Sequence, residues 1–153
     1  MKAALGLGSN LGDRRQHLLW ARRQLEKHDK VEAFSKMVET EPVGRPAGER
    51  AFLNAAAIVS GDVTPRGLLE IATELETQLG RNPADREGPR ALDIDILLVD
   101  DLEIDEPGLV VPHPELAERL FVLEPLAEVA GDWIVPGKFC SVEVCLEDLR
   151  ARR

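Results

Sequence analysis

The order of strand-like and helix-like segments constrains the fold of this chain most. Alternating small and apolar residues predict strands, and apolar residues spaced three and four apart predict helices. These signals predict a strand at Lys2–Gly8, a helix from a cap at Asp13 to about His28, strands at Val31–Glu39 and Ala51–Ser60, a helix from Thr64-Pro65 to Gly80, and a strand around Asp93 and Asp95. This β-α-β-β-α-β order is typical of an α+β, ferredoxin-like sandwich with helices on one face of an antiparallel sheet.

Further elements follow this core as a C-terminal extension. Acidic residues at Asp100-Asp101 and a turn at Pro107-Gly108 predict a hairpin-like segment. A short helix to Leu120, an apolar run at Phe121–Val129 and a helix from about Ser141 come next. The chain of 153 residues contains no repeat and no linker-like stretch, so we expect one domain over residues 1–153.

Charge and cysteine content exclude several classes of protein. The formal net charge of −9 disfavours nucleic acid and anionic membranes as general partners. No run approaches the roughly 18 apolar residues of a membrane span, and the N-terminal segment lacks the pattern of a signal peptide. Cys140 and Cys145 have no histidine nearby, which favours reduced thiols over a zinc site. We therefore expect a cytoplasmic protein, with a monomer as the default state.

Two carboxylates alternate with apolar residues in the strand at the end of the core. Asp93 and Asp95 are expected on one face, while the other face carries Leu92, Ile94, Ile96 and Leu98. Mg²⁺ prefers one or two carboxylates, with waters and substrate phosphates completing its coordination shell. The strand therefore predicts a magnesium site for phosphoryl chemistry, and two solvated surface acids are the alternative.

Arginines precede these acids on a loop at Arg81–Ala91. A guanidinium group matches phosphate oxygens bidentately, so this loop favours a polyphosphate ligand. The side chains concerned are Arg81, Arg86 and Arg90. Ion pairs between Arg90 and the aspartates are the simpler structural alternative.

Other candidate positions carry weaker signals on their own. Phe52 and Asn54 fall on one face of their strand, where an aromatic ring beside an amide can stack on and hydrogen-bond a flat heterocycle. His113 lies between two prolines, and a structural role and a catalytic role are equally open. Phe121 begins an apolar run, so core packing is its default role.

In this order the motifs resemble the 6-hydroxymethyl-7,8-dihydropterin pyrophosphokinase family of folate biosynthesis. The resemblance runs nearly end to end. It is carried by Gly8-Ser9-Asn10-Leu11-Gly12, Thr40-Glu41-Pro42-Val43-Gly44, Phe52-Leu53-Asn54-Ala55-Ala56, Leu79-Gly80-Arg81, Gly88-Pro89-Arg90-Ala91-Leu92-Asp93-Ile94-Asp95-Ile96, Val111-Pro112-His113-Pro114 and Arg119-x-Phe121-Val122-Leu123.

The resemblance implies transfer of the β,γ-pyrophosphoryl group of ATP to the hydroxymethyl oxygen of a pterin, with release of AMP. It implies that Asp93 and Asp95 bind two Mg²⁺ ions, and that Arg81, Arg90 and Asp95 are catalytic. The implied pterin-binding residues are Thr40, Pro42, Val43, Phe52, Asn54 and Phe121. The implied ATP-binding residues are Arg81, Arg86, Arg90, His113 and Arg119.

The chain departs from the family pattern at three loop positions. Pro83 stands about where the family has a further basic residue. Glu87 and Pro114 stand where the family commonly has aromatic residues. Two other functions remain open from the sequence: a catalytically inert nucleotide- or pterin-binding module on the same fold, and a two-metal phosphotransferase for another heterocycle.

Overall fold

A computed structural model describes residues 1–40, 51–80 and 89–152 of the chain. Its elements are β1 (Lys2–Ser9), α1 (Arg14–Leu25), β2 (Lys30–Phe34), β3 (Val38–Thr40), β4 (Phe52–Ser60), α2 (Pro65–Gln78), β5 (Asp93–Val99), β6 (Ile104–Glu106), β7 (Leu109–Val111), a 3₁₀ turn η1 (Leu116–Glu118), α3 (Leu120–Ala130), β8 (Ile134–Val135), β9 (Cys140–Ser141) and α4 (Val142–Ala151). None of the helices in these ranges is long and apolar enough to cross a membrane.

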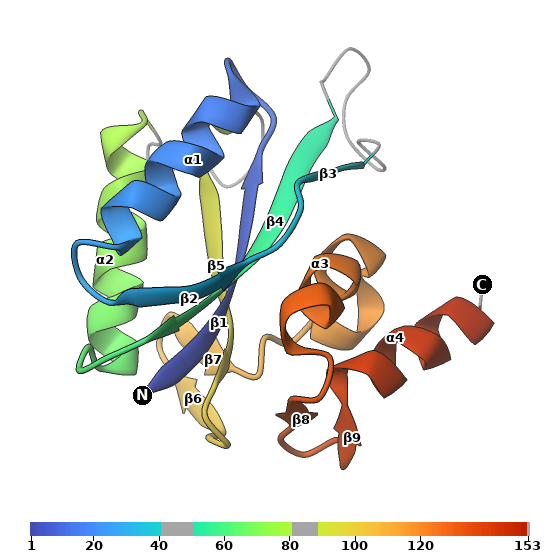
Figure 1. Ribbon diagram of the computed structural model, residues 1–153. Helices are drawn as coiled ribbons and strands as arrows, with labels where there is room; N and C mark the ends of the chain where they lie inside the picture. The colour runs from blue at the N-terminus through green and yellow to red at the C-terminus, as the bar shows by residue number, and fades with distance from the viewer. Residues whose placement is uncertain (41–50, 81–88, 153) are drawn as a thin grey trace.

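The main sheet has the strand order β2-β4-β1-β5, with the short strand β3 also paired to β4. All of these pairings are antiparallel. The order confirms the predicted ferredoxin-like α+β arrangement. Because β1 lies between β4 and β5, it forms the centre of the sheet (Figure 1).

Helices α1 and α2 cover one face of the sheet, as the sequence predicts (Figure 1). The Asp13 side chain accepts a hydrogen bond from the Gln16 amide, and Thr64 accepts one from the Gly67 amide, so both expected N-caps form. Gly80 follows α2 with φ +94°, a conformation that favours glycine and ends the helix. The helices bury their leucines against β1, β4 and β5 in the first core layer.

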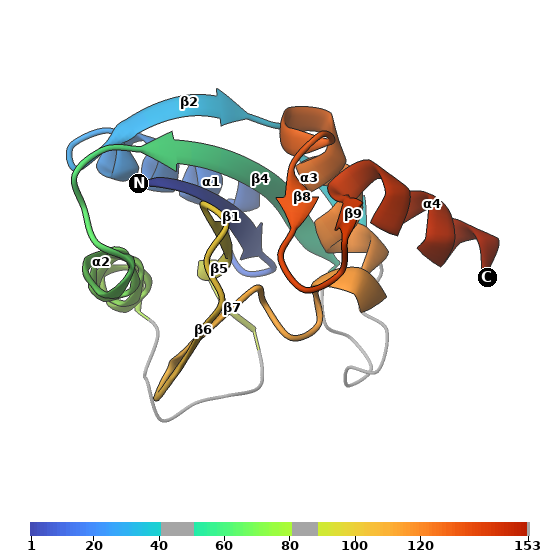
Figure 2. The same cartoon turned by 90° about the horizontal axis from the view of Figure 1, so that it is seen from below.

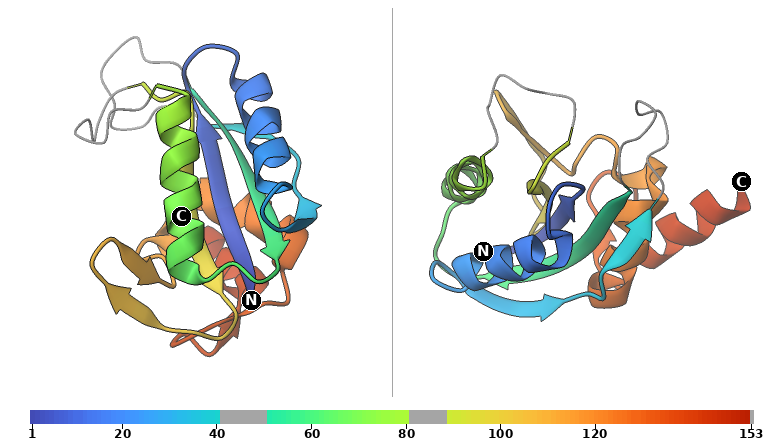
Figure 3. Two further views of the ribbon diagram at one scale, coloured as in Figure 1. Left: turned by 90° about the vertical axis from the view of Figure 1, so that its left-hand side faces the viewer. Right: turned by 90° about the horizontal axis from the view of Figure 1, so that it is seen from above.

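The C-terminal extension covers the second face of the sheet. The sequence interpretation predicted helices on the other face only. The predicted apolar run forms helix α3, which packs on β4 and on α4. Figures 2 and 3 show α3 and α4 on the opposite side of the sheet from α1 and α2. Leu123 and Leu126 of α3 are fully buried in this second layer. The Pro107-Gly108 turn joins β6 to β7 as the expected hairpin.

The predicted strand Val31–Glu39 is wrong as a single element, because it divides into β2 and β3. At the break, the Ser35 hydroxyl accepts a hydrogen bond from the Ala56 amide at 2.8 Å. The next amide, that of Lys36, donates to Glu128 of α3 at 2.7 Å. The Ser35 amide still donates to the Ala56 carbonyl at 2.8 Å, but the Ala56 and Lys36 amides both donate to side chains, and the regular pairing is interrupted between the two short strands.

A β-bulge in β5 corrects the predicted placement of Leu98. Leu5 of β1 pairs with Ile96 and Ala4 pairs with Leu98, which leaves Leu97 as the extra residue. Ile94 and Ile96 therefore face the first core layer, whereas Leu97 and Leu98 face the second. The strict alternation predicted for this strand therefore holds through Leu97 and breaks at Leu98.

Candidate active site

A pocket of about 700 Å³ opens on the second face of the sheet, beside the start of α3. It lies at one end of the sheet, where β1 ends and where β4 and β5 begin. Its lining comes from six elements and the residue between η1 and α3: Gly6, Leu7, Gly8, Val38, Glu39, Thr40, Phe52, Asn54, Ala55, Asp93, Asp95, Glu118, Arg119, Leu120, Phe121, Val122, Glu124 and Pro125.

The two predicted carboxylates line this pocket together. Asp93 pairs with Gly8 across the ladder, and Asp95 pairs with Gly6, so the two carboxylates share one face of β5. Both aspartates are partly buried. Because the paired β1 residues carry no side chains, the space over this part of the sheet stays open.

The two carboxylates suit Mg²⁺ better than a metal ion whose ligands all come from protein side chains. The described ranges contain no group of three or more His, Cys, Asp or Glu side chains placed to hold a metal. Two carboxylates beside an open pocket leave positions for waters and phosphate oxygens, which is the shell that Mg²⁺ prefers. The residues present therefore fit the ion that the sequence implies.

Arg90 is held next to the carboxylates by the loop after β1. Its amide donates to the Asn10 side-chain oxygen at 2.6 Å, and its carbonyl accepts from the Asn10 amide at 2.9 Å. Its guanidinium lies 3.4 Å from the Asp93 carboxylate, and the Arg90 side chain is 14% exposed. The ion pair considered from the sequence therefore forms, but in a mostly buried position beside the pocket.

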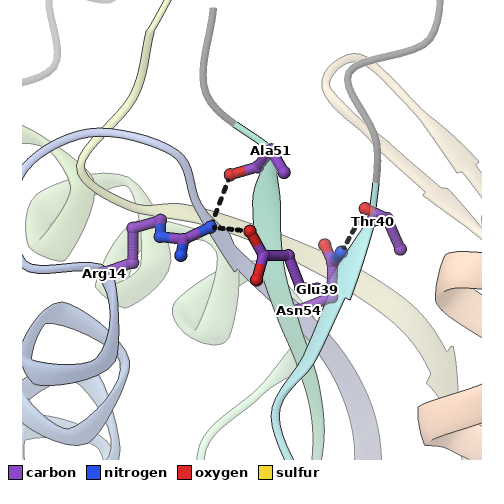
Figure 4. A network of polar contacts seen from close by, with 5 residues as sticks. All are labelled: Arg14, Glu39, Thr40, Ala51 and Asn54. Atoms are coloured by element: carbon purple, nitrogen blue, oxygen red, sulfur yellow. Dashed lines mark hydrogen bonds and ion pairs between the residues drawn. The ribbon is translucent and has the colours of Figure 1, made fainter.

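Aromatic and amide groups form the other part of the pocket. Phe52 and Asn54 of β4 both line it, whereas Leu53 packs against the first core layer, as their alternation predicts. The Asn54 amide nitrogen donates to the Thr40 hydroxyl at 2.8 Å (Figure 4). Phe121 lines the pocket from the start of α3 and is 39% exposed. An exposed aromatic ring here contradicts the default role of core packing.

Gly8 makes this arrangement sterically feasible. A Cβ atom at this position would lie 3.2 Å from the Asn54 side-chain oxygen and 3.3 Å from the Phe52 ring. These distances are tighter than ordinary van der Waals contact. A larger residue at position 8 would therefore displace the ring and the amide from the pocket wall.

Arg119 and His113 occupy different surroundings. Arg119 lines the pocket, forms an ion pair with Glu115, and its guanidinium carbon lies 5.5 Å from the Phe121 ring centroid. His113 is not among the residues that line the pocket. Its Nδ1 accepts a hydrogen bond from the Glu115 amide at 3.1 Å, which ties the ring to the turn before η1.

Four predicted site residues lie outside the described ranges: Pro42, Val43, Arg81 and Arg86. The departures from the family pattern at Pro83 and Glu87 lie there too. The structure leaves their assignments as predictions.

The sequence interpretation missed several residues that shape the site. Gly6 lies opposite Asp95, and the Gly-x-Gly pattern within a strand was the available signal for a close backbone approach. Glu76 of α2 is 9% exposed and accepts a hydrogen bond from the Ile94 amide at 2.8 Å. It thus supports the outer edge of β5 between the two aspartates, a contact that no local pattern reveals.

Comparisons with known proteins match this chain to one family. A family model described as 7,8-dihydro-6-hydroxymethylpterin-pyrophosphokinase (HPPK) matches residues 4–131. The 2-amino-4-hydroxy-6-hydroxymethyldihydropteridine pyrophosphokinase of Bacillus subtilis is 43% identical over 129 residues, covering 83% of this chain and 77% of the relative. The protein of the same name from Methylorubrum extorquens is 39% identical over 139 residues, covering 90% and 87%.

A solved structure of the Plasmodium falciparum HPPK-DHPS triple mutant with pteroate is similar in fold. Its TM-score is 0.77 at 15% sequence identity, and the match covers 99% of this chain and 43% of that chain. The present chain thus spans less than half the length of the Plasmodium chain. At this level of identity the likeness concerns the fold alone.

Proposed function

The chain belongs to the 7,8-dihydro-6-hydroxymethylpterin-pyrophosphokinase family, and we propose that it transfers pyrophosphate from ATP to 6-hydroxymethyl-7,8-dihydropterin in folate biosynthesis. The products are AMP and the pterin diphosphate. One observation carries the proposal: a single pocket is lined by aromatic and amide side chains from β4 and α3 and by two carboxylates from β5.

The pterin is assigned to the side of the pocket formed by β3, β4 and the start of α3. Phe52 and Phe121 come from different elements, so their rings are suited to stack on the two sides of a flat heterocycle. The bond from the Asn54 amide nitrogen to Thr40 fixes the orientation of this amide. Its oxygen is then the group that accepts a hydrogen bond from the pterin edge. Pro42 and Val43 are proposed to add contacts on this side.

The triphosphate of ATP is assigned to the side formed by β5. The described lining carries five carboxylates but a single basic side chain, Arg119, so a polyanion needs further cations there. When bound at Asp93 and Asp95, two Mg²⁺ ions would supply positive charge to the phosphate oxygens. Arg81, Arg86, Arg90 and His113 are proposed to complete the ATP contacts.

The chain's own groups then position the two reactants. The hydroxymethyl oxygen of the pterin forms a bond to the β-phosphorus of ATP, and the bond from that phosphorus to the α,β-bridging oxygen breaks, releasing AMP. We assign alignment of the hydroxyl, and acceptance of its proton, to Asp95. Arg81 and Arg90 offset negative charge on the transferred group. Positioning and electrostatic stabilisation supply most of the rate in such transfers.

Release of AMP from ATP, Mg²⁺ and 6-hydroxymethyl-7,8-dihydropterin tests this proposal directly. The wild-type chain should release AMP only when the pterin is present. Asp95→Ala should lower the rate about a thousandfold, because a group that acts on the reacting atoms is lost. Asp101→Ala is the matched control: this exposed aspartate lies outside the pocket, so its rate should equal that of the wild type.

The alternatives predict different outcomes of the same assay. A wild-type chain that binds both ligands in calorimetry but releases no AMP would overturn the activity in favour of an inert binding module. Release of AMP with another heterocycle in preference to the pterin would overturn the substrate.

We further propose that the protein acts as a cytoplasmic monomer of one domain without nucleic acid as a partner. The net charge of −9 supports the last point, because it repels a polyanion. Size-exclusion chromatography with light scattering tests the oligomeric state: a dimer mass would contradict it.

A further inference from the structure

We propose that Arg14 is a positioning residue for pterin recognition, which acts by holding β3 against β4 next to the pterin-facing side chains. The inference rests on the proposed function, since it assigns a role within that pocket. Arg14 is the first residue of α1, and it is absent from the pocket lining. Its effect on a ligand must therefore pass through the residues that it contacts.

Arg14 contacts the two strands at adjacent points. Its Nη1 donates to the Ala51 carbonyl at 2.8 Å and lies 3.2 Å from the Glu39 carboxylate (Figure 4). The Arg14 side chain is 18% exposed whereas Glu39 is 59% exposed, so solvent screens the ion pair with Glu39 more than the bond to the Ala51 carbonyl. One guanidinium group thus joins Glu39, the middle residue of β3, to Ala51, the residue that precedes β4.

The position of Arg14 in its helix indicates that these contacts matter. The first turn of α1 contains no acidic residue. A cation there is unfavourable, because the N-terminal end of a helix carries partial positive charge. Removing Arg14 should consequently not weaken α1. The contacts with Ala51 and Glu39 offset the electrostatic cost.

Strand β3 depends on such an external tie. It has three residues and pairs with β4 along one side only. Thr40 pairs with Phe52, and Glu39 pairs with Leu53. The two partners of Arg14 therefore each lie one residue before a pterin-facing residue: Glu39 before Thr40, and Ala51 before Phe52.

Displacement of β3 would be transmitted to the amide that reads the pterin. Asn54 is 7% exposed, and its amide nitrogen donates to the Thr40 hydroxyl. When Thr40 shifts, this donor loses its partner and the amide is free to rotate. Asp93 and Asp95 are held separately, by the ladder between β5 and β1 and by Glu76. Arg14 should therefore affect the pterin side of the pocket and leave the phosphate side unchanged.

The test is a series of variants assayed for AMP release and for pterin binding in the presence of a non-hydrolysable ATP analogue. Arg14→Ala should raise the KM and Kd for 6-hydroxymethyl-7,8-dihydropterin about tenfold, the size expected for loss of one charge-assisted hydrogen bond. The KM for ATP and the kcat at saturating pterin should change less than about twofold. Arg14→Lys keeps a cation and should recover part of the affinity. Glu39→Gln keeps the Ala51 contact and should have a smaller effect than Arg14→Ala.

Arg22→Ala is the matched control. Arg22 lies on the same helix and also forms an ion pair, with Glu26 at 3.3 Å, but its side chain is 43% exposed and lies outside the pocket. The pterin affinity of the Arg22→Ala variant should equal that of the wild type.

Unchanged pterin affinity in Arg14→Ala would overturn the inference, as would an equal rise in the KM values for pterin and ATP, which indicates general disruption. If Arg14→Ala fails to fold, Arg14→Lys and Glu39→Gln decide by the same two KM values. A wild-type chain that neither binds the pterin nor releases AMP would instead overturn the proposed function itself.

Discussion

The two faces of the sheet use the same central strand in opposite ways. On the first face, β1 contributes Ala3, Leu5 and Leu7 to a closed core beneath α1 and α2. On the second face it contributes Ala4, which is buried under the C-terminal helices, and then Gly6 and Gly8, which line the pocket. On one side, the side chains of β1 thus build a core layer. On the other side, Ala4 belongs to a second core, and the two glycines leave room for the pocket.

Because of this difference, neighbouring residues of β1 should contribute separately to stability and to ligand binding. Leu5 and Gly6 are adjacent in the chain, yet a change at one should affect unfolding and a change at the other should affect ligands. Substitutions on the two faces therefore test whether stability and ligand binding are independent.

Leu5→Ala should lower the free energy of unfolding by about 2–5 kcal/mol, because it removes buried methyl groups and leaves a cavity. Leu5 is fully buried in the first layer. Urea denaturation measures the loss. Its kcat/KM, assayed well below the melting temperature, should match that of the wild type. A large fall in kcat/KM would show that the two faces are not independent.

Gly8→Val should raise the Kd for the pterin about a hundredfold, since a branched side chain would displace Phe52 and Asn54. Gly8 is not in the left-handed region, so the new residue adds no backbone strain. Gly8→Ala, with a single added carbon, should give a smaller increase. Fluorescence titration with the pterin measures both, and affinities equal to that of the wild type would contradict the assignment of this wall.

Phe121→Ala should weaken pterin binding about tenfold through loss of one stacking surface, and it should scarcely change stability. Phe121 is 39% exposed, so little packing is lost. Val144→Ala is the matched control, because Val144 is an apolar residue of α4 that is 43% exposed and lies outside the pocket. Equal pterin affinities of the two variants would contradict a stacking role for Phe121.

Cys145 in the second core layer gives a test through the pH dependence of stability. Burial, together with the neighbouring Cys140 thiol, raises the pKa of Cys145 from 9.0 to about 12. The folded state therefore retains this proton between these two pH values, where the unfolded chain loses it. The stability that this proton contributes should be complete below pH 9.0 and should decline as the pH rises towards about 12.

Comparison of urea midpoints for the wild type and Cys145→Ala across this pH range measures the contribution of the thiol. The wild type should lose more stability than the variant. Parallel curves for the two proteins would contradict the raised pKa.

Local patterns in the sequence predicted the parts of the structure that depend on local physics. Asp13, Thr64 and Gly80 mark helix ends by their own hydrogen bonds and dihedral preferences, and these were predicted correctly. The alternation at Asp93 and Asp95 correctly placed both acids on one face. Their catalytic and metal-binding roles remain predictions.

The remaining features depend on contacts between distant segments. The break between β2 and β3 involves Ala56 and Glu128, and the bulge at Leu97 is a shift of register against Ala4 and Leu5 of the distant strand β1. Arg14 contacts residues 25 and 37 positions away. No spacing rule within a short window can indicate such partners.

The central place of β1 also bears on how the chain is made. Its neighbours β4 and β5 begin at residues 52 and 93, so β1 is synthesised before both of its partners. The pocket wall from α3 is synthesised later still, at residues 118–125. Substrates therefore cannot act as a template for folding until the pocket residues of α3 have been synthesised. An unpaired strand edge can pair with other chains, so β1 is open to aggregation in that interval.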